Sequence, residues 1–187
     1  KISLCRLVSQ RRPQCWSTPI RHCGVGFQPM NIAVGDFNLD GLPEIAVALS
    51  ESHIPIIDRS GAQLASIETD GWVWWVKNTD ATGPGEATLV ALQHRIDSHV
   101  ASGKLLGITG SSVLWTHPLS RAGSGSEELD RIVIDAQRRS VVFGVACDNV
   151  VSSLSFRGEL LWSTRVTTES KWASIMHLRP IRGGRSM

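Results

Sequence analysis

The chain has 187 residues, with 19 Lys and Arg against 17 Asp and Glu, and therefore a formal net charge of +2. This length suits one ordinary domain or part of a larger one, and 42% hydrophobic residues are enough for a buried core, which excludes a wholly disordered chain. No run of 18 apolar residues occurs, so the sequence predicts no transmembrane helix.

The charges are distributed unevenly along the chain. Residues 1–30 carry five basic residues and no acidic one, and residues 163–187 carry five basic residues and one acidic one, whereas the body between them is acidic. A nucleic-acid-binding domain gathers Lys and Arg on its folded face, so this pattern argues against a nucleic-acid partner. We expect the basic ends to be solvated or frayed. Residues 1–30 also lack the basic start and apolar stretch of a signal peptide.

None of the four cysteines stands in a C-x-x-C pair, which argues against a zinc ribbon or a thioredoxin-type site. They are Cys5, Cys15, Cys23 and Cys147. Cys15 and Cys23 could form a disulfide in an oxidising compartment, and free or buried thiols fit the sequence equally well. The cysteines alone therefore leave the compartment open.

A short pattern recurs along the chain: a glycine turn, an apolar pair and a small hydroxyl residue. It occurs as GAQLAS at 61–66, GSSVLWT at 110–116 and GELLWS at 158–163, with a weaker copy, QCWST, at 14–18. Aligned on one position, the copies lie 49, 50 and 47 residues apart, at Trp16, Ala65, Trp115 and Trp162. A period near 48 residues is typical of a propeller blade made of four short strands.

Apolar, β-branched runs of strand length keep the same phase as this repeat. They lie at 43–49, 54–58, 85–92, 140–146 and 150–156. We expect each glycine turn to reverse the chain as a hairpin, and the Trp after it to pack between neighbouring sheets. A helix over 86–100 competes for part of this region, but a strand at 87–92 is favoured because it keeps the phase of the other units.

The patterns together predict an all-β fold, a partial β-propeller of about three to four four-stranded blades. We expect a first partial blade within the basic segment 1–30, blades over 31–162, and a basic segment at 163–187 that is frayed or begins another blade. Propellers normally close with four to eight blades, so the remaining blades are expected from further chain or from a partner. A solenoid-like stack of the same sheets is the alternative.

One motif carries evident chemistry, the segment GDFNLDGLPE at 35–44. It places oxygen ligands at alternate positions, with a glycine at the sixth position that permits a sharp turn. The candidate ligands are Asp36, Asn38, Asp40, the carbonyl of Leu42, and Glu44. Three carboxylates and one amide form a hard, oxygen-only shell that suits Ca²⁺. A metal-free Asx turn is the alternative interpretation.

The loop is not an EF-hand, because the twelfth position, which needs a bidentate Glu, is Val47. Its flanks, NIAV before and EIAVAL after, are typical of strands and not of helices. We therefore expect the ion to lie in a β-hairpin loop, where it would hold two strands together.

In this strand context, GDFNLDGLPEIAVAL resembles the FG-GAP repeat, also called the VCBS or integrin-α-type repeat, and the match covers about 32–66. The resemblance implies a calcium-binding propeller blade, with the metal held by Asp36, Asn38, Asp40, Glu44 and the Leu42 carbonyl. It also implies an extracellular, cell-surface or periplasmic protein that serves as an adhesion, interaction or scaffold module. The segments SSVLWT and GELLWS resemble the strand ends of quinoprotein-type propeller repeats.

The other repeat units depart from the metal-binding pattern. KNTDATGPGE at 77–86 keeps Asp80 and Glu86 without the alternate spacing, and this makes them a less regular second candidate site. IDAQRRSVV at 134–142 carries arginines where acids would be needed, and these cations would repel a metal.

No catalytic pattern is evident, since the sequence has no G-x-S-x-G elbow, no P-loop and no H-E-x-x-H motif. The sequence therefore predicts a non-enzymatic module with a protein or glycan partner. Two alternatives stay open: the propeller part of a quinoprotein-type or polysaccharide-acting enzyme, and a carbohydrate-binding module that uses Trp72, Trp74 and Trp75 as an aromatic platform. Packing between blades is the favoured role for these tryptophans, with Trp72 and Trp74 on one strand face and Trp75 on the other.

Overall fold

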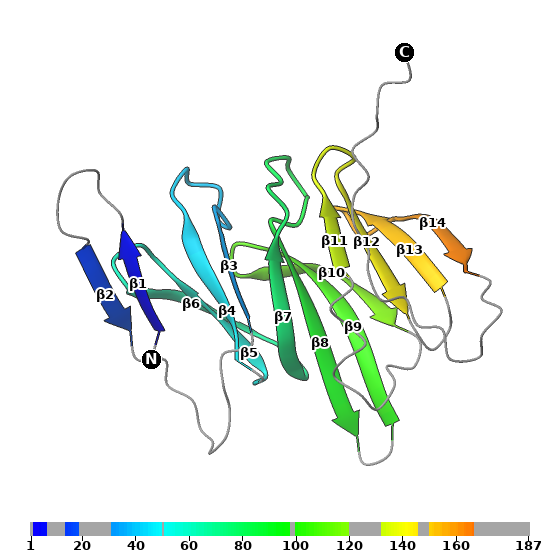
Figure 1. Cartoon of the computed structure of the whole chain (residues 1–187), viewed down its shortest axis with the longest axis horizontal. Coiled ribbons are helices and arrows are strands. Elements are labelled where there is room, and N and C mark those ends of the chain that lie inside the picture. Colours follow the sequence, from blue (N-terminus) through cyan, green and yellow to red (C-terminus); the bar gives the residue numbers. More distant parts are fainter. Residues whose placement is uncertain are drawn as a thin grey trace.

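The computed structural model describes residues 2–6, 14–18, 31–49, 51–97, 100–119, 132–145 and 150–166. Every element in these ranges is a β-strand, and the strands form one two-stranded and three four-stranded antiparallel sheets (Figure 1). The predicted all-β fold is confirmed. Across the described residues, no helix is long and apolar enough to cross a membrane.

Each four-stranded sheet is a meander whose strands lie side by side in chain order. Sheet I contains β3 (Asn31–Gly35), β4 (Glu44–Ala48), β5 (His53–Ile57) and β6 (Gln63–Glu68). Sheet II contains β7 (Trp72–Asn78), β8 (Leu89–Asp97), β9 (Val100–Thr109) and β10 (Ser112–Leu119). Sheet III contains β11 (Ile132–Asp135), β12 (Ser140–Val145), β13 (Val150–Ser155) and β14 (Leu160–Arg165). Because β8 occupies 89–97, the helical alternative is wrong over these residues.

The 48-residue sequence repeat corresponds to a structural repeat at the hairpin between the third and fourth strand of each sheet. The turn glycines there all have positive φ: Gly61 (90°), Gly110 (56°) and Gly158 (84°). In each fourth strand the register then shifts by one residue, which leaves a bulged leucine just before the aligned position. These leucines are Leu64, Leu114 and Leu161. A positive-φ glycine followed by the same one-residue bulge in all three sheets shows that the sheets are copies of one unit, although the turn of sheet II is shorter than the turns of sheets I and III.

The core lies between the sheets, because both faces of each sheet carry apolar side chains at alternate positions. Sheets I and II enclose one buried cluster: Ala33, Phe37, Ala46, Ala48, Ile54, Ile56, Ile67, Val73, Val76, Leu89, Ala91, Leu106 and Ile108. Sheets II and III enclose a second: Ala81, Val90, Leu92, Leu105, Leu119, Ile132, Val141, Phe143, Leu154 and Phe156. Full burial of one such aliphatic side chain contributes roughly 1.5–3 kcal/mol. The two junctions are therefore the main source of stability.

Trp115 closes the junction between sheets II and III, as the sequence predicts. Its indole lies against Gly107 of its own sheet and Gly158 of the next. The indole Nε1–H donates a hydrogen bond of 2.9 Å to the carbonyl of Phe156 in sheet III. Since both glycines lack a Cβ, the ring approaches the two backbones directly.

The face of sheet I that points away from sheet II is also covered. Ile45, Val47, Leu49 and Ile57 form a cluster there, and each is at most 6% exposed. The small sheet of β1 (Ile2–Arg6) and β2 (Gln14–Thr18) pairs Cys5 opposite Cys15.

Several expectations fall outside the described residues. Cys23 and Cys147, the rest of the segment 1–30 and the end of 163–187 are among them. The two alternatives for Cys15 and Cys23, a disulfide or thiols, therefore both stand, and the outer domain boundaries stay predictions.

We expect Gly107→Ala to destabilise the protein, because the added Cβ would overlap the Trp115 indole. Overpacking of this kind typically costs about 1–3 kcal/mol, measurable as a lower denaturation midpoint. In the double variant Gly107→Ala/Trp115→Ala, the overlap is gone, so the total loss should be smaller than the sum of the two single losses. Strictly additive losses would show that the two residues do not contact each other.

Candidate metal centre

The loop between β3 and β4 carries the predicted metal ligands. It lies at the edge of the molecule where the other loops between first and second strands also gather, the upper edge in Figure 1. Two residues turn the chain through left-handed backbone angles, Leu39 (φ 63°) and Gly41 (φ 86°). Phe37, 1% exposed, anchors the loop in the cluster between sheets I and II.

The acidic and amide side chains of the loop point toward its own backbone. The two carboxylate oxygens of Asp36 accept hydrogen bonds from the backbone N–H groups of Asp40 (3.0 Å) and Gly41 (2.8 Å). Asn38 Oδ1 accepts a second bond from the Asp40 N–H (2.9 Å), and Asp40 Oδ1 accepts one from the Leu42 N–H (2.8 Å). The loop is thus curled around its side-chain oxygens.

Three carboxylates converge inside this curl. Asp36, Asp40 and Glu44 each offer an oxygen, and these oxygens all lie within 4.8 Å of one another. Glu44 is buried, with 2% of its surface exposed, and its Oε2 accepts the Phe37 N–H at 2.8 Å. Such a set of hard oxygen donors fits a divalent cation such as Ca²⁺.

The raised pKa of Glu44 agrees with a cation-binding role for the three carboxylates. Burial raises the pKa of its carboxyl above the ordinary value, and the negative charges of Asp40 and Asp36 add to this rise. The backbone N–H groups of Phe37 and Asn38 oppose the rise by stabilising the carboxylate. A cation among the three groups would relieve both the burial penalty and the mutual repulsion.

The metal-ligand loop is fastened to sheet II. The carbonyl of Phe37 accepts hydrogen bonds from Thr88 Oγ1 (2.9 Å) and from the backbone N–H of Gly110 (2.7 Å). The Asn78 side-chain amide also donates to the Val34 carbonyl at the end of β3 (3.1 Å). The loop is therefore part of the junction between two sheets as well as a hairpin turn.

The second candidate pair is not brought together as a metal site. Glu86 is bound by the guanidinium of Arg139, with an Nε–Oε1 distance of 2.9 Å and a second bond from Nη2 to Oε2. Asp80 accepts a 2.6 Å hydrogen bond from Asn78. Among the described residues, only Asp36, Asp40 and Glu44 form a group of potential metal-ligating side chains. Arg139, which sequence analysis placed in the metal-repelling third unit, thus neutralises Glu86.

The tryptophans of β7 differ from the predicted arrangement. A bulge between Val73 and Trp75 breaks the alternation, so that Trp72 pairs with His94 and Trp75 pairs with Leu92. His94 and Leu92 lie on one face of β8, and therefore Trp72 and Trp75 share a face; the prediction of opposite faces is wrong. Trp75 packs against the cluster between sheets II and III, with Lys77 Nζ 4.5 Å from its ring centroid. This packing agrees with a role for Trp75 between blades.

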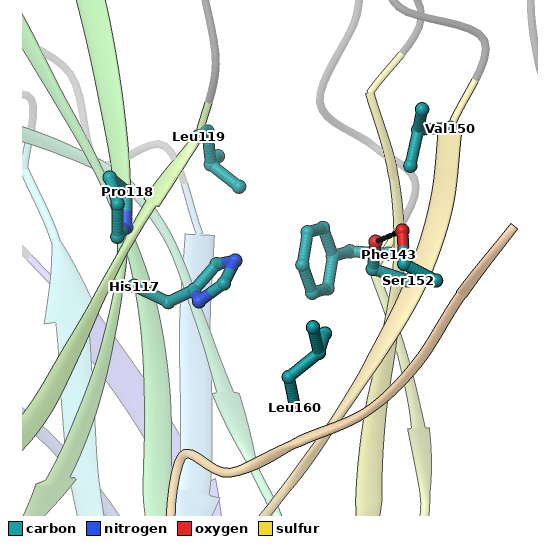
Figure 2. Close-up of a pocket in the computed structure, with 8 residues that line it drawn as sticks. His117, Pro118, Leu119, Phe143, Val150, Ser152 and Leu160 are labelled. Carbon is teal, nitrogen blue, oxygen red and sulfur yellow. Dashed lines mark hydrogen bonds between the residues drawn. The ribbon is translucent and has the colours of Figure 1, made fainter. Parts of the chain in front are cut away.

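A hollow of about 200 Å³ lies between the end of β10 and sheet III (Figure 2). Its lining is His117, Pro118, Leu119, Phe143, Val150, Ser152, Leu160 and Ser163. The rings of His117 and Phe143 have centroids 5.5 Å apart, and Ser152 and Ser163 are hydrogen-bonded at 2.9 Å. No sequence motif marks this hollow, because its residues come from four strands that only the fold brings together.

No protein-family model matches the chain, and no curated protein matches it significantly in sequence. Several solved structures are similar in fold. The β-propeller domain of Cps50 (Swd1) from Myceliophteria thermophila matches with 14% identity and a TM-score of 0.50, over 84% of this chain and 49% of that one. BamB from Moraxella catarrhalis matches with 18% identity and a TM-score of 0.47, over 73% of this chain and 37% of that one. BBS1N in complex with ARL6DN matches with 14% identity and a TM-score of 0.44, over 83% and 45%.

The chain spans less than half the length of each of these structures. The likeness to the Swd1 domain, together with three repeated four-stranded sheets, supports a β-propeller fold. The comparisons link the chain to no enzyme family.

Two histidines, the buried His94 and the half-buried His117, make stability depend on pH. Burial lowers the pKa of His94 and of His117 below the ordinary value of 6.5. The unfolded chain therefore binds these protons more readily than the folded one, so their contribution to stability is complete above pH 6.5 and is lost as the pH falls through the folded-state pKa values. We expect the free energy of unfolding to fall below pH 6.5, with a slope of up to about 1.4 kcal/mol per pH unit from His94.

The variant His94→Leu should flatten this slope in denaturant titrations at several pH values, and the double variant His94→Leu/His117→Leu should flatten it further. An unchanged slope in the double variant would contradict the assignment to these two side chains.

Proposed function

We propose that this chain is a calcium-stabilised β-propeller segment of the FG-GAP or VCBS kind, which binds another macromolecule and does not catalyse a reaction. The observation that carries the proposal is the convergence of three carboxylates, one of them buried, in a loop fastened to the neighbouring sheet. Asp36, Asp40 and Glu44 would hold the ion, with Asn38 and the Leu42 carbonyl as the further ligands that the motif supplies.

The bound ion would supply positive charge that offsets three clustered carboxylates. The chain then transmits this stabilisation from the loop to the strands. Glu44 begins β4, and Asp36 directly follows β3, so drawing their carboxylates together fixes the hairpin between these strands. Because Phe37 lies between them and bonds to sheet II, fixing the hairpin also fixes the junction.

An interaction role is supported by the outer strands. The three bulged leucines are large apolar side chains that stay exposed at equivalent positions: Leu64 (52%), Leu114 (40%) and Leu161 (50%). A contiguous exposed apolar patch marks an interaction site, and we propose that these leucines contribute to one. The proposal includes a calcium-rich compartment: extracellular, cell-surface or periplasmic. Extracellular calcium-binding modules typically have Kd values on the order of 10⁻⁴–10⁻³ M, and ions at that affinity are bound only where Ca²⁺ is abundant.

We expect Ca²⁺ to stabilise the protein. For Kd values in that range, about 1 mM Ca²⁺ should raise the free energy of unfolding by about 0.4–1.4 kcal/mol and the Tm by a few degrees relative to EDTA. Isothermal titration calorimetry should report one ion per chain at this loop, and equal melting curves in Ca²⁺ and EDTA would reject the site.

The variant Asp40→Asn tests the same site, because its effect on the Tm should have opposite directions in EDTA and in Ca²⁺. In EDTA it removes carboxylate repulsion, so its Tm should equal or exceed that of the parent, whereas in Ca²⁺ it should lose the calcium-dependent rise. Asp58→Asn is the matched control, because Asp58 also caps a turn of sheet I through backbone N–H groups but lies outside the carboxylate cluster. The control should keep the full calcium response.

A further inference from the structure

The small sheet of β1 and β2 lies at the end of the molecule away from sheet III (Figure 1). Among the described strands, β1 and β2 hydrogen-bond only to each other. The sequence repeat aligns Trp16 of β2 with the fourth strands of the three larger sheets, so β1 and β2 correspond to the third and fourth strands of a blade. An isolated pair of strands is only marginally stable in water, so this pair needs a further source of stability.

The ladder of this small sheet differs from the larger sheets at one informative position. In sheets I, II and III, the residue just before the aligned position is a bulged leucine that has no partner across the ladder. In β2 the same position is Cys15, and the register of β1 and β2 runs without a shift over its whole length. Cys15 therefore has a partner in the neighbouring strand, and that partner is Cys5.

This register brings the backbones of the two cysteines within the span of a disulfide. Residues directly opposite each other in an antiparallel pair have Cα atoms about 4.5–5.5 Å apart, according to whether the pair is hydrogen-bonded. A disulfide joins residues whose Cα atoms are about 4.4–6.8 Å apart, so either type of pair can hold one without movement of the backbone. Of the register positions in the described sheets, this is the one that pairs two cysteines.

We propose that Cys5 and Cys15 form a disulfide that joins β1 to β2. In the balanced step, two S–H bonds break and one S–S bond forms. The two electrons and two protons pass by thiol–disulfide exchange to an external disulfide, such as glutathione disulfide, which becomes two thiols. Extracellular and periplasmic compartments are oxidising and keep such a bond formed.

The link stabilises a sheet that has fewer strands than its counterparts. In sheets I, II and III, two further strands support the hairpin of the third and fourth strands, whereas β1 and β2 have only each other among the described strands. A covalent bond between them also restricts the unfolded chain. The inference goes beyond the proposed function and does not rest on it, because neither cysteine lies in the metal loop at 36–44.

Trypsin places the four cysteines on four different peptides, which makes the pairing directly measurable. The peptides that carry Cys5, Cys15, Cys23 and Cys147 are 2–6, 12–21, 22–59 and 140–157. The full chain is equilibrated with oxidised and reduced glutathione, its free thiols are blocked with N-ethylmaleimide, and the digest is analysed by mass spectrometry without reduction. We expect peptide 2–6 linked to peptide 12–21, loss of this species in dithiothreitol, and blocked thiols on the other two peptides.

Two variants test the register itself. In a background of Cys5→Ser and Cys15→Ser, the changes Ser3→Cys and Ser17→Cys move the pair two positions along the ladder, to a pair of the same hydrogen-bonding type. This variant should link the same two peptides. Leu4→Cys combined with Cys5→Ser moves one cysteine out of register with Cys15, and successive positions of a strand point to opposite faces. This second variant should lose most of the linked species in the same buffer.

Three outcomes would overturn the proposal. The first is a link between peptides 12–21 and 22–59, which joins Cys15 to Cys23. The second is four blocked thiols in oxidised glutathione. The third is a link between 2–6 and 12–21 that occurs only in disulfide-bonded dimers, which a non-reducing gel separates from monomers. The calcium-dependent rise in Tm, measured on the same samples, distinguishes each of these outcomes from failure of the proposed calcium site.

Discussion

The structure depends on the inability of a four-stranded sheet to bury its own two apolar faces. Each sheet here needs a neighbour, and the contact of Trp115 with Gly107 and Gly158 shows how that need is met. One large ring fills the space that two missing Cβ atoms leave, and its only polar atom is satisfied by the backbone of the next sheet. Burial and hydrogen bonding therefore favour the same arrangement. At the junction of sheets I and II the aligned residue is Ala65, and there aliphatic side chains and Phe37 fill the space between the sheets.

The candidate metal loop belongs to the same scheme. Its carboxylates form a local cluster, but Phe37, in the middle of the loop, places its ring in the core and its carbonyl against Thr88 and Gly110 of sheet II. In the next junction Glu86 and Arg139 link the corresponding loops of sheets II and III through an ion pair. Successive junctions thus close with different chemistry at the same edge of the fold: hydrogen bonds to the Phe37 carbonyl in one, and an ion pair in the other.

The sequence predicted what local pattern controls. The constant period of the glycine turns predicted the four-stranded sheets. The alternate oxygen ligands around Gly41 predicted the loop whose carboxylates the fold brings together. The bulge at Trp74 was not predicted, because a single extra residue in a strand is decided by packing and leaves no periodic signal. The pairing of Glu86 with Arg139, 53 residues apart, and the hollow beside His117 depend on which strands become neighbours, and this information is not local.

The bulges in the fourth strands have a consequence for solubility. Strands β6, β10 and β14 each end a sheet, and an unpaired strand edge invites polymerisation by edge-to-edge addition. A one-residue bulge beside Leu64, Leu114 and Leu161 interrupts the regular spacing of backbone donors and acceptors, so an incoming strand cannot continue the ladder. At these three described strands, apolar side chains can therefore stay exposed while the bulge hinders strand addition at the backbone.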